Sequence, residues 1–193
     1  REPITFENLK RHIGSPLLQT AQKVLGGDPP KEELEHFCER FNVFMAQTFF
    51  DGLEELPGAK WILRELRGQG YKVALLTNKQ RTSTEKVCAH VGIGRLLTTI
   101  IATDLDKPEL RKPEPAYAQL ALEQMEAKAE EVVLIGDSET DFLAAKAGNF
   151  ANCYLVTTGT HSEKELLEIG APQKNIFPDL WRLGEKVFDL ISP

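Results

Sequence analysis

The fold is predicted most directly by the stretch Val132-Val133-Leu134-Ile135-Gly136-Asp137-Ser138-Glu139-Thr140-Asp141. It opens with four apolar residues, three of them β-branched, which is typical of a strand buried in a parallel sheet. Gly136 permits a tight turn, and the small and apolar residues of 142–148 predict a helix. A strand, a turn and a helix in this order indicate one unit of an α/β sheet.

Two carboxylates follow this predicted strand. Asp137 lies at its carboxyl end and Asp141 lies one helical turn further on. Ligands of open α/β sheets bind outside these strand ends, and Mg²⁺ takes one or two carboxylates together with phosphate oxygens and water. The pair therefore predicts a Mg²⁺ site formed by Asp137 and Asp141. The structural alternative is that Ser138 caps the helix, with Asp141 as its acidic partner three residues later.

Strands and helices alternate from Pro57 onward, at the spacing of βαβ units. This alternation predicts an α/β fold with a doubly wound, mostly parallel sheet. The predicted strands are 71–79, 99–102, 132–136, 151–156 and 175–177, and the predicted helices are 59–67, 83–91, 115–126, 142–147, 163–169 and 180–191.

Residues 1–52 have a different pattern and predict an all-helical unit, which leaves 53–193 as the α/β unit. The helices are expected over 5–14, from Pro16 to 25, and over a long third segment. Apolar residues of that third helix fall on one stripe, which predicts a core face: Leu34, Phe37, Cys38, Phe41, Phe44, Met45 and Phe49.

Composition excludes several classes of function. The net charge is −6, from 23 basic and 29 acidic residues, which argues against a nucleic-acid or membrane surface. No apolar run approaches the roughly 18 residues of a membrane span. The three cysteines are far apart in the chain and form no CxxC, which favours unpaired thiols in a reducing, cytoplasmic setting. Nothing in the sequence indicates an oligomeric state.

Polar residues also follow another predicted strand and precede a predicted helix. Thr77 and Asn78 end the strand 71–79, where a hydroxyl, an amide and backbone N–H groups suit a phosphate. Lys112 lies in a proline-stiffened loop, where its ammonium group could offset the charge of a phosphate and of nearby carboxylates. Each has a plain alternative, because Thr and Asn are common turn residues and lysine is usually solvated.

In combination these motifs resemble the haloacid dehalogenase superfamily, in its phosphoglycolate-phosphatase-like branch with a helical (C1-type) cap. Leu75-Leu76-Thr77-Asn78-Lys79 is similar to the second family motif, whose Thr binds the transferring phosphoryl group. Lys112 in Lys-Pro-Glu-Pro resembles the third motif, and residues 136–141 resemble the fourth, which carries Mg²⁺. The resemblance implies that 53–193 form a Rossmann-like core and that 1–52 form the cap.

The implied activity is a Mg²⁺-dependent phosphatase acting on a small phosphorylated metabolite, such as phosphoglycolate. The reaction would proceed through an aspartyl-phosphate, with Mg²⁺ and Lys112 neutralising phosphoryl charge. A phosphomutase on the same fold is an alternative that the cap would decide. A non-catalytic binding protein that has lost its nucleophile is another. A dehalogenase fits less well, because its reaction needs no metal and Asp137 with Asp141 predict one.

The first family motif, Asp-x-Asp-Gly-Thr after a hydrophobic strand, does not occur in the sequence where the resemblance requires it. It supplies the nucleophile, and we expect it ahead of Arg1, on a strand at the centre of the sheet. Without that strand its two neighbours would be unpaired, and we expect residues 1–193 alone to be inactive. Asp104 and Asp106 also follow a predicted strand, but Lys107-Pro108 replace Gly-Thr, so they are not assigned as this motif.

Two further segments border the expected site. The resemblance places Arg11 and Gly14 in the cap, near the leaving group of the substrate, although a solvated helix face is an alternative for Arg11. Residues 157–160 (Thr-Thr-Gly-Thr) follow a predicted strand and are either a plain turn or part of the border of the site. The histidines show no metal-binding spacing and are interpreted as surface or packing residues.

Overall fold

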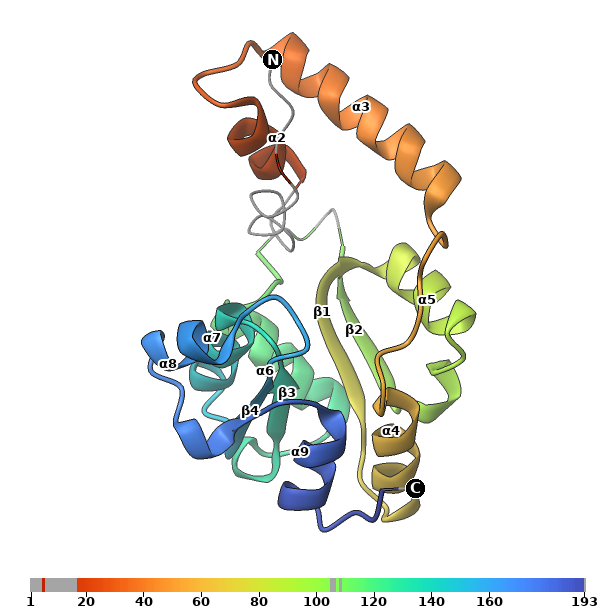
Figure 1. The fold of residues 1–193 in the computed structure, drawn as a ribbon, viewed down its shortest axis with the longest axis vertical. Helices are drawn as coiled ribbons and strands as arrows, with labels where there is room; N and C mark the ends of the chain where they lie inside the picture. The colour runs from red at the N-terminus through yellow and green to blue at the C-terminus, as the bar shows by residue number, and fades with distance from the viewer. Residues whose placement is uncertain (1–4, 6–16, 105–106, 108, 193) are drawn as a thin grey trace. The chain divides into compact units, whose positions relative to one another are not determined.

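The computed structural model describes residue 5 and residues 17–104, 107 and 109–192. The chain divides into two compact units, residues 1–53 and 54–193, and each is described by itself (Figure 1). Arg11, Gly14, Asp106 and most of the helix predicted over 5–14 lie outside the described residues.

The first unit contains two described helices, α2 (Leu17–Leu25) and α3 (Lys31–Thr48), which pack against each other. Gly26 and Gly27 end α2 with positive φ angles of 68° and 65°. Leu34 of α3 is buried, but Phe41 and Phe44 are 40% and 61% exposed, so the predicted core stripe is wrong at these two residues. The 18 residues of α3 extend about 27 Å, whereas the 9 of α2 extend about 14 Å, so α2 can cover only half of it.

The described part of the second unit contains five parallel strands, which confirms the α/β fold. They are β1 (Ala74–Gln80), β2 (Thr99–Thr103), β3 (Val133–Gly136), β4 (Asn152–Val156) and β5 (Ile176–Phe177). They form two sheets: β1 pairs with β2, and β4 pairs with both β3 and β5. In the described part of the chain, β1 and β3 therefore each have one edge without a ladder partner.

The six described α-helices of this unit connect and flank the strands (Figure 1). They are α4 (Ala59–Gly68), α5 (Arg81–His90), α6 (Pro115–Met125), α7 (Glu139–Ala147), α8 (Glu163–Glu168) and α9 (Leu180–Val187). Short 3₁₀ turns occur at Gly94–Leu96, Ala129–Glu131 and Gln173–Asn175. α9 ends earlier than the predicted 191, and Asp189 just beyond it has a positive φ of 52°.

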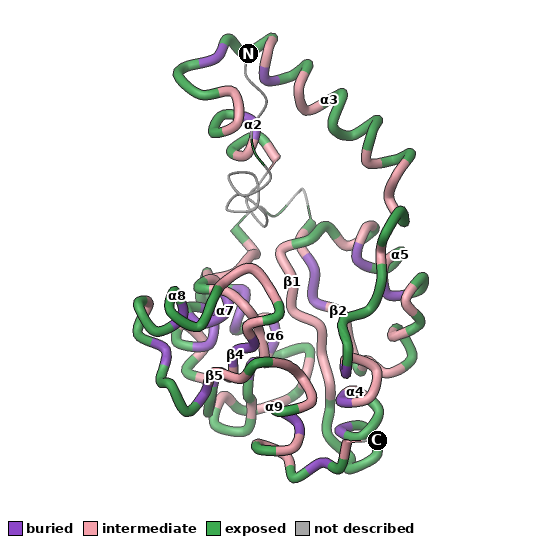
Figure 2. The backbone as a smooth tube through the Cα atoms, viewed as in Figure 1, coloured by how far each residue is buried: buried purple, intermediate pink, exposed green. Residues whose placement is uncertain are grey.

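The core of the three-stranded sheet follows the alternation of side chains along its strands. Leu134 and Leu155 pack with Phe142 of α7 and Leu166 of α8. Val156, the next residue after Leu155, packs instead with α4 and α9. Helices therefore cover both faces of this sheet, and the buried positions in Figure 2 lie along these strands and helices.

The two-stranded sheet has its own core. Ile101 of β2 packs with Tyr117 and Ala121 of α6, and Leu76 of β1 lies against the same cluster. α5 packs against both β1 and β2. Thr77 and Asn78, which were predicted to form part of a site, lie in the second half of β1, where its pairing with β2 becomes irregular between Thr77 and Gln80.

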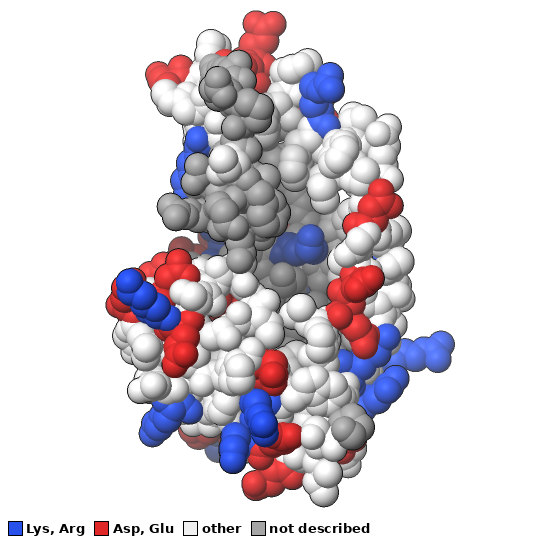
Figure 3. Space-filling view, in the orientation of Figure 1, with Lys and Arg blue, Asp and Glu red and all other residues white. Residues whose placement is uncertain are grey.

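Charged side chains of both signs are interspersed over the face of the second unit that Figure 3 shows. This is consistent with the modest net charge of −6. Among the described residues, no helix combines the length and the apolar character that crossing a membrane requires.

Candidate active site

The turn between β3 and α7 forms a capping box. Helix α7 begins at Glu139, earlier than the predicted 142, because Ser138 is its N-cap. Ser138 Oγ accepts a hydrogen bond from the Asp141 backbone N–H at 3.3 Å, and Asp141 Oδ2 accepts from Ser138 N and Oγ at 3.2 and 2.6 Å. The structural alternative for these residues is thus observed, and it places Asp141 in the first turn of the helix.

Asp141 has further partners that tie it to a distant loop. Its Oδ2 also accepts from the Asp137 backbone N–H at 3.1 Å, and its Oδ1 lies 2.5 Å from Lys112 Nζ. The residue is 5% exposed. Burial by itself would raise the pKa of Asp141, but the charge of Lys112 and the hydrogen bonds from Lys112, Ser138 and Asp137 hold that pKa below its usual value. Asp141 is therefore an ionised, buried carboxylate.

Gly136 makes this packing possible. A Cβ atom at this position would overlap the carboxyl group of Asp141. The close approach of the side chain to the backbone at the end of β3 therefore requires glycine, a requirement separate from the turn that the sequence predicted.

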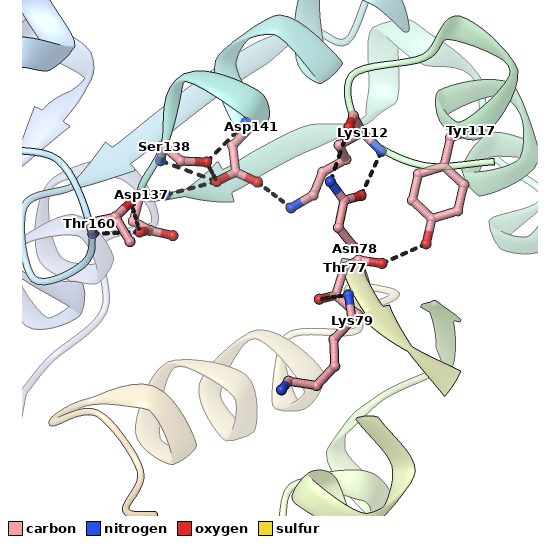
Figure 4. Close-up of polar contacts among 9 residues, drawn as sticks. All are labelled: Thr77, Asn78, Lys79, Lys112, Tyr117, Asp137, Ser138, Asp141 and Thr160. Carbon is pink, nitrogen blue, oxygen red and sulfur yellow. Dashed lines mark hydrogen bonds and ion pairs between the residues drawn. The ribbon is translucent and has the colours of Figure 1, made fainter. Parts of the chain in front are cut away.

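Lys112 is held in place by Asn78 at the end of the other sheet. Asn78 Nδ2 donates to the Lys112 carbonyl oxygen at 3.0 Å, and the Lys112 backbone N–H donates to Asn78 Oδ1 at 2.7 Å. The Lys112 side chain is 13% exposed. The amide therefore fixes the backbone of the lysine, and Asp141 holds its ammonium group, as Figure 4 shows.

Thr77 is positioned by a contact that the sequence did not indicate. The Tyr117 hydroxyl donates to the Thr77 carbonyl oxygen at 2.7 Å. Tyr117 is 1% exposed, and burial raises the pKa of its hydroxyl, so the group stays protonated as a donor. Thr77 Oγ1 accepts from the Lys79 backbone N–H at 3.1 Å, which leaves the single proton of this hydroxyl available to a ligand. The sequence did not indicate this role of Tyr117, because an aromatic residue among apolar residues of a helix is expected to be part of the core.

Asp137 is less enclosed than Asp141. Its Oδ2 accepts from the backbone N–H and the hydroxyl of Thr160, at 2.8 and 2.9 Å. No described residue donates to its Oδ1. Thr160 belongs to the segment 157–160, for which a plain turn and a place at the site were both open. The structure brings Thr160 into contact with Asp137 (Figure 4).

The carboxylate oxygens at the end of β3 are the kind of ligand that suits Mg²⁺. A half-buried carboxylate with one oxygen free of described donors is a hard ligand, and Mg²⁺ usually needs only one or two such groups because phosphate and water complete its shell. Both Asp141 oxygens already accept hydrogen bonds. The described residues contain no cluster of three or more His, Cys, Asp or Glu able to hold a metal by themselves. Asp137 therefore fits the ion better than Asp141, whose predicted role as a ligand stays a prediction.

The segment 100–106 was not assigned as the nucleophile motif. In the structure, Asp104 of this segment has an ion-pair partner. Its Oδ1 lies 3.5 Å from Arg81 Nε, and Arg81 Nη1 also donates to the Ile100 carbonyl oxygen at 3.1 Å. Asp104 therefore interacts with the start of α5.

Comparison with known proteins identifies the class to which this fold and these strand-end residues belong. A family model described as haloacid dehalogenase-like hydrolase matches residues 1–154. The chain therefore belongs to the haloacid dehalogenase-like hydrolases, which confirms the resemblance drawn from its motifs.

Several curated relatives of the chain are phosphoglycolate phosphatases. The chain is 31% identical over 157 residues to a phosphoglycolate phosphatase from Pectobacterium atrosepticum, a match that covers 81% of this chain and 65% of the relative. It spans 62% and 54% of two further curated phosphoglycolate phosphatases, so it covers less than two thirds of the length of these relatives.

Solved structures agree on the fold. A Lactobacillus delbrueckii protein, provisionally described as a phosphoglycolate phosphatase, matches with a TM-score of 0.81 at 20% identity, over 97% of this chain and 84% of that one. A Thermotoga maritima protein, provisionally described as a beta-phosphoglucomutase, matches with a TM-score of 0.70 at 24% identity, over 96% and 86%. At these identities the likeness concerns the fold alone.

Proposed function

We propose that the intact protein is a Mg²⁺-dependent phosphatase that hydrolyses a small phosphorylated metabolite, a phosphomonoester resembling phosphoglycolate. The observation that carries the proposal is the ion pair between Lys112 and Asp141, at 2.5 Å and largely buried. It holds a fixed positive charge beside the ends of β1 and β3, where Thr77, Asn78 and Asp137 also lie. The curated phosphoglycolate phosphatases among its relatives support the choice of substrate class.

Lys112 and Thr77 would bind the phosphoryl group. One proton of the Lys112 ammonium group bonds Asp141, and its remaining protons can bond phosphoryl oxygens. The Thr77 hydroxyl can donate its proton to another of these oxygens. Donors held in place before the reaction stabilise the charge on the transferring group without reorganising.

The nucleophile in this proposal is an aspartate ahead of Arg1. Its carboxylate would attack phosphorus, and the ester oxygen would leave as an alcohol after taking a proton from the second aspartate of the same motif. Water, giving its proton back to that aspartate, would then hydrolyse the aspartyl-phosphate to inorganic phosphate. The strand that carries it would pair between β1 and β3. In the described part of the chain β1 bonds only to β2 and β3 only to β4, which supports this position.

Asp137 would hold Mg²⁺ through Oδ1, the oxygen to which no described residue donates, together with groups from the strand proposed ahead of Arg1 and from the substrate. When bound, the ion would neutralise charge on the phosphoryl oxygens. Lys112 adds a second positive charge from the other sheet. We also propose a reducing, cytoplasmic setting, since Cys38, Cys88 and Cys153 are all free thiols.

A phosphomutase is the second candidate, because the Thermotoga maritima protein described above, whose description names a phosphoglucomutase, shares this fold. The two reactions share the aspartyl-phosphate and differ in its fate. A phosphatase passes the phosphoryl group to water, whereas a mutase returns it to a second hydroxyl of the substrate.

The test uses the full-length protein with a panel of phosphorylated metabolites, followed by phosphorus NMR in Mg²⁺ and in EDTA. The proposal predicts inorganic phosphate from phosphoglycolate or a similar small ester, in Mg²⁺ only. Lys112→Met and Asp137→Asn should each abolish it. A rearranged phosphate ester would establish the mutase instead, and Mg²⁺ binding without turnover on any substrate would indicate a binding protein. Residues 1–193 alone should release no phosphate.

A further inference from the structure

The loop after β4 contributes Thr160 and His161, which have no part in the phosphatase chemistry proposed above, to a chain of hydrogen bonds that begins at Asp137. This chain of hydrogen bonds runs from Asp137 through Thr160 to His161. The Thr160 backbone N–H and hydroxyl donate to Asp137 Oδ2 at 2.8 and 2.9 Å, and Thr160 Oγ1 lies 2.9 Å from His161 Nδ1. All three residues are half-buried. Asp137 and Thr160 follow different strands, β3 and β4, which pair in parallel.

The protons of this chain can be assigned from its chemistry. A threonine hydroxyl carries one proton, and an ionised carboxylate can only accept. The hydroxyl proton therefore goes to Asp137, and the Thr160 oxygen can only accept from the histidine. His161 must then carry its proton on Nδ1, because the partner of a ring nitrogen sets the tautomer.

Gly159 shows how closely this loop approaches the carboxylate. A Cβ atom at Gly159 would overlap the Asp137 carboxyl group. The backbone of the loop thus lies directly against one side of Asp137. Two groups donate to Oδ2 and no described residue donates to Oδ1, so Oδ1 is the oxygen that we expect to bind a ligand.

We propose that Thr160 is a positioning residue that makes Asp137 a single-oxygen ligand for a divalent cation, and that His161 orients the Thr160 hydroxyl from the other side. The cation rests on the function proposed above, whereas the hydrogen-bond chain does not. Partners that orient a metal-binding side chain typically change metal affinity about 10- to 100-fold when they are removed. Because the Thr160 backbone N–H would survive substitution of its side chain, we expect an effect at the lower end of this range.

The first experiment titrates Mg²⁺ into the full-length protein by calorimetry. Thr160→Val keeps the branched shape and removes the hydroxyl, Thr160→Ser keeps the hydroxyl, and Thr158→Val is the matched control on an exposed neighbour. We expect Thr160→Val to bind Mg²⁺ about tenfold more weakly. Thr160→Ser and Thr158→Val should bind within about twofold of the wild type. Equal affinity of Thr160→Val and Thr158→Val would overturn the proposal, as would Thr160→Ser as weak as Thr160→Val.

The second experiment reads the His161 ring by nitrogen NMR at about pH 8.5, where an ordinary histidine is neutral. His161→Gln assigns the signal by its loss. The wild type should show the proton on Nδ1, and Thr160→Val should lose this preference while Thr158→Val keeps it. A wild-type His161 ring that carries its proton on Nε2 would contradict the proposed hydrogen bonds from His161 to Thr160 and from Thr160 to Asp137. This result would hold even if Thr160→Val failed to fold. Absence of Mg²⁺ binding by the wild type would instead overturn the proposed metal-dependent function. The nitrogen signal of His161 would then still test the hydrogen bonds among Asp137, Thr160 and His161.

Discussion

The ends of the two sheets hold their polar groups in different ways. At the end of the three-stranded sheet, Asp141 is held largely by residues three and four positions away, Ser138 and Asp137. At the end of the two-stranded sheet, Thr77 and Asn78 are held by Tyr117 and Lys112, 40 and 34 positions away. The first end is a local motif, and the second depends on the packing of a distant loop and helix.

The ion pair between Lys112 and Asp141 joins these two arrangements. Its lysine is fixed by the two-stranded sheet through Asn78, and its carboxylate belongs to the turn after β3. Neither end is therefore independent of the other. The difference teaches that a site can be assembled from one half whose local structure is encoded in adjacent residues and another whose geometry is set by tertiary contacts.

Breaking the ion pair should have the largest effect. Lys112→Met leaves Asp141 buried without its cation, which should lower the free energy of unfolding by about 3 kcal/mol. Urea denaturation measures this change. Lys79→Met is the control, because this lysine at the end of β1 is exposed, and should change stability by less than about 0.5 kcal/mol. Equal stability of the two variants would mean that the pair does not join the two ends as described.

Substituting the two carboxylates of the turn after β3 should have different effects, one mainly on stability and the other mainly on metal binding. Asp141→Asn removes the charge that faces Lys112 and should cost about 2 kcal/mol of stability. Asp137→Asn changes a half-buried group and should lower the free energy of unfolding by less than about 1 kcal/mol. It should weaken the binding of Mg²⁺ at least about tenfold. Denaturation and calorimetry on both full-length variants provide the comparison. A larger stability loss for Asp137→Asn would reverse the roles assigned here.

The contribution of Asp141 should also depend on pH. Its pKa in the folded protein lies below its ordinary value, so the group stabilises the fold above about pH 4 and loses this contribution as the pH falls through the folded pKa. The stability gap between the wild type and Asp141→Asn should be constant from about pH 5 to 7 and shrink below about pH 4. Denaturation curves at several pH values measure it. A gap that widens in acid would contradict the lowered pKa.

The smallest effect is expected at the two-stranded sheet. Tyr117→Phe removes the donor to the Thr77 carbonyl oxygen and should cost about 1 kcal/mol of stability. If this contact also orients Thr77, the KM for the phosphorylated substrate should rise. Tyr71→Phe is the matched control, because Tyr71 is 49% exposed. Identical behaviour of both variants would show that the end of β1 does not need Tyr117.

Much of the architecture was predictable from residue patterns. The five strands and the helices of residues 54–193 lie close to their predicted positions, because apolar runs, glycines and prolines mark the boundaries of βαβ units. Where the predictions were wrong, packing was the reason. The apolar stripe of α3 remains exposed at Phe41 and Phe44, because spacing along a helix does not say how much of it a neighbour covers.

The candidate site was predictable in its residue types but not in their partners. The Ser138–Asp141 capping box was one of two alternatives that the sequence offered, and the structure shows that it coexists with the Lys112 ion pair. Tyr117 and His161 gave no usable signal. Their contacts join side chains to atoms of other elements or depend on the direction of a loop, which no periodicity records.

The α/β class, the family and the strand-end residues could be predicted from residue patterns, because they follow from hydrophobic periodicity and from short motifs whose residues are close in the chain. The contacts that these residues make could be seen only in the folded protein. It engages both oxygens of Asp141 and leaves one of Asp137 free of described donors, through contacts with Lys112 and Thr160. Those contacts cross 29 and 23 positions, and distances over such separations are set by packing of the whole unit.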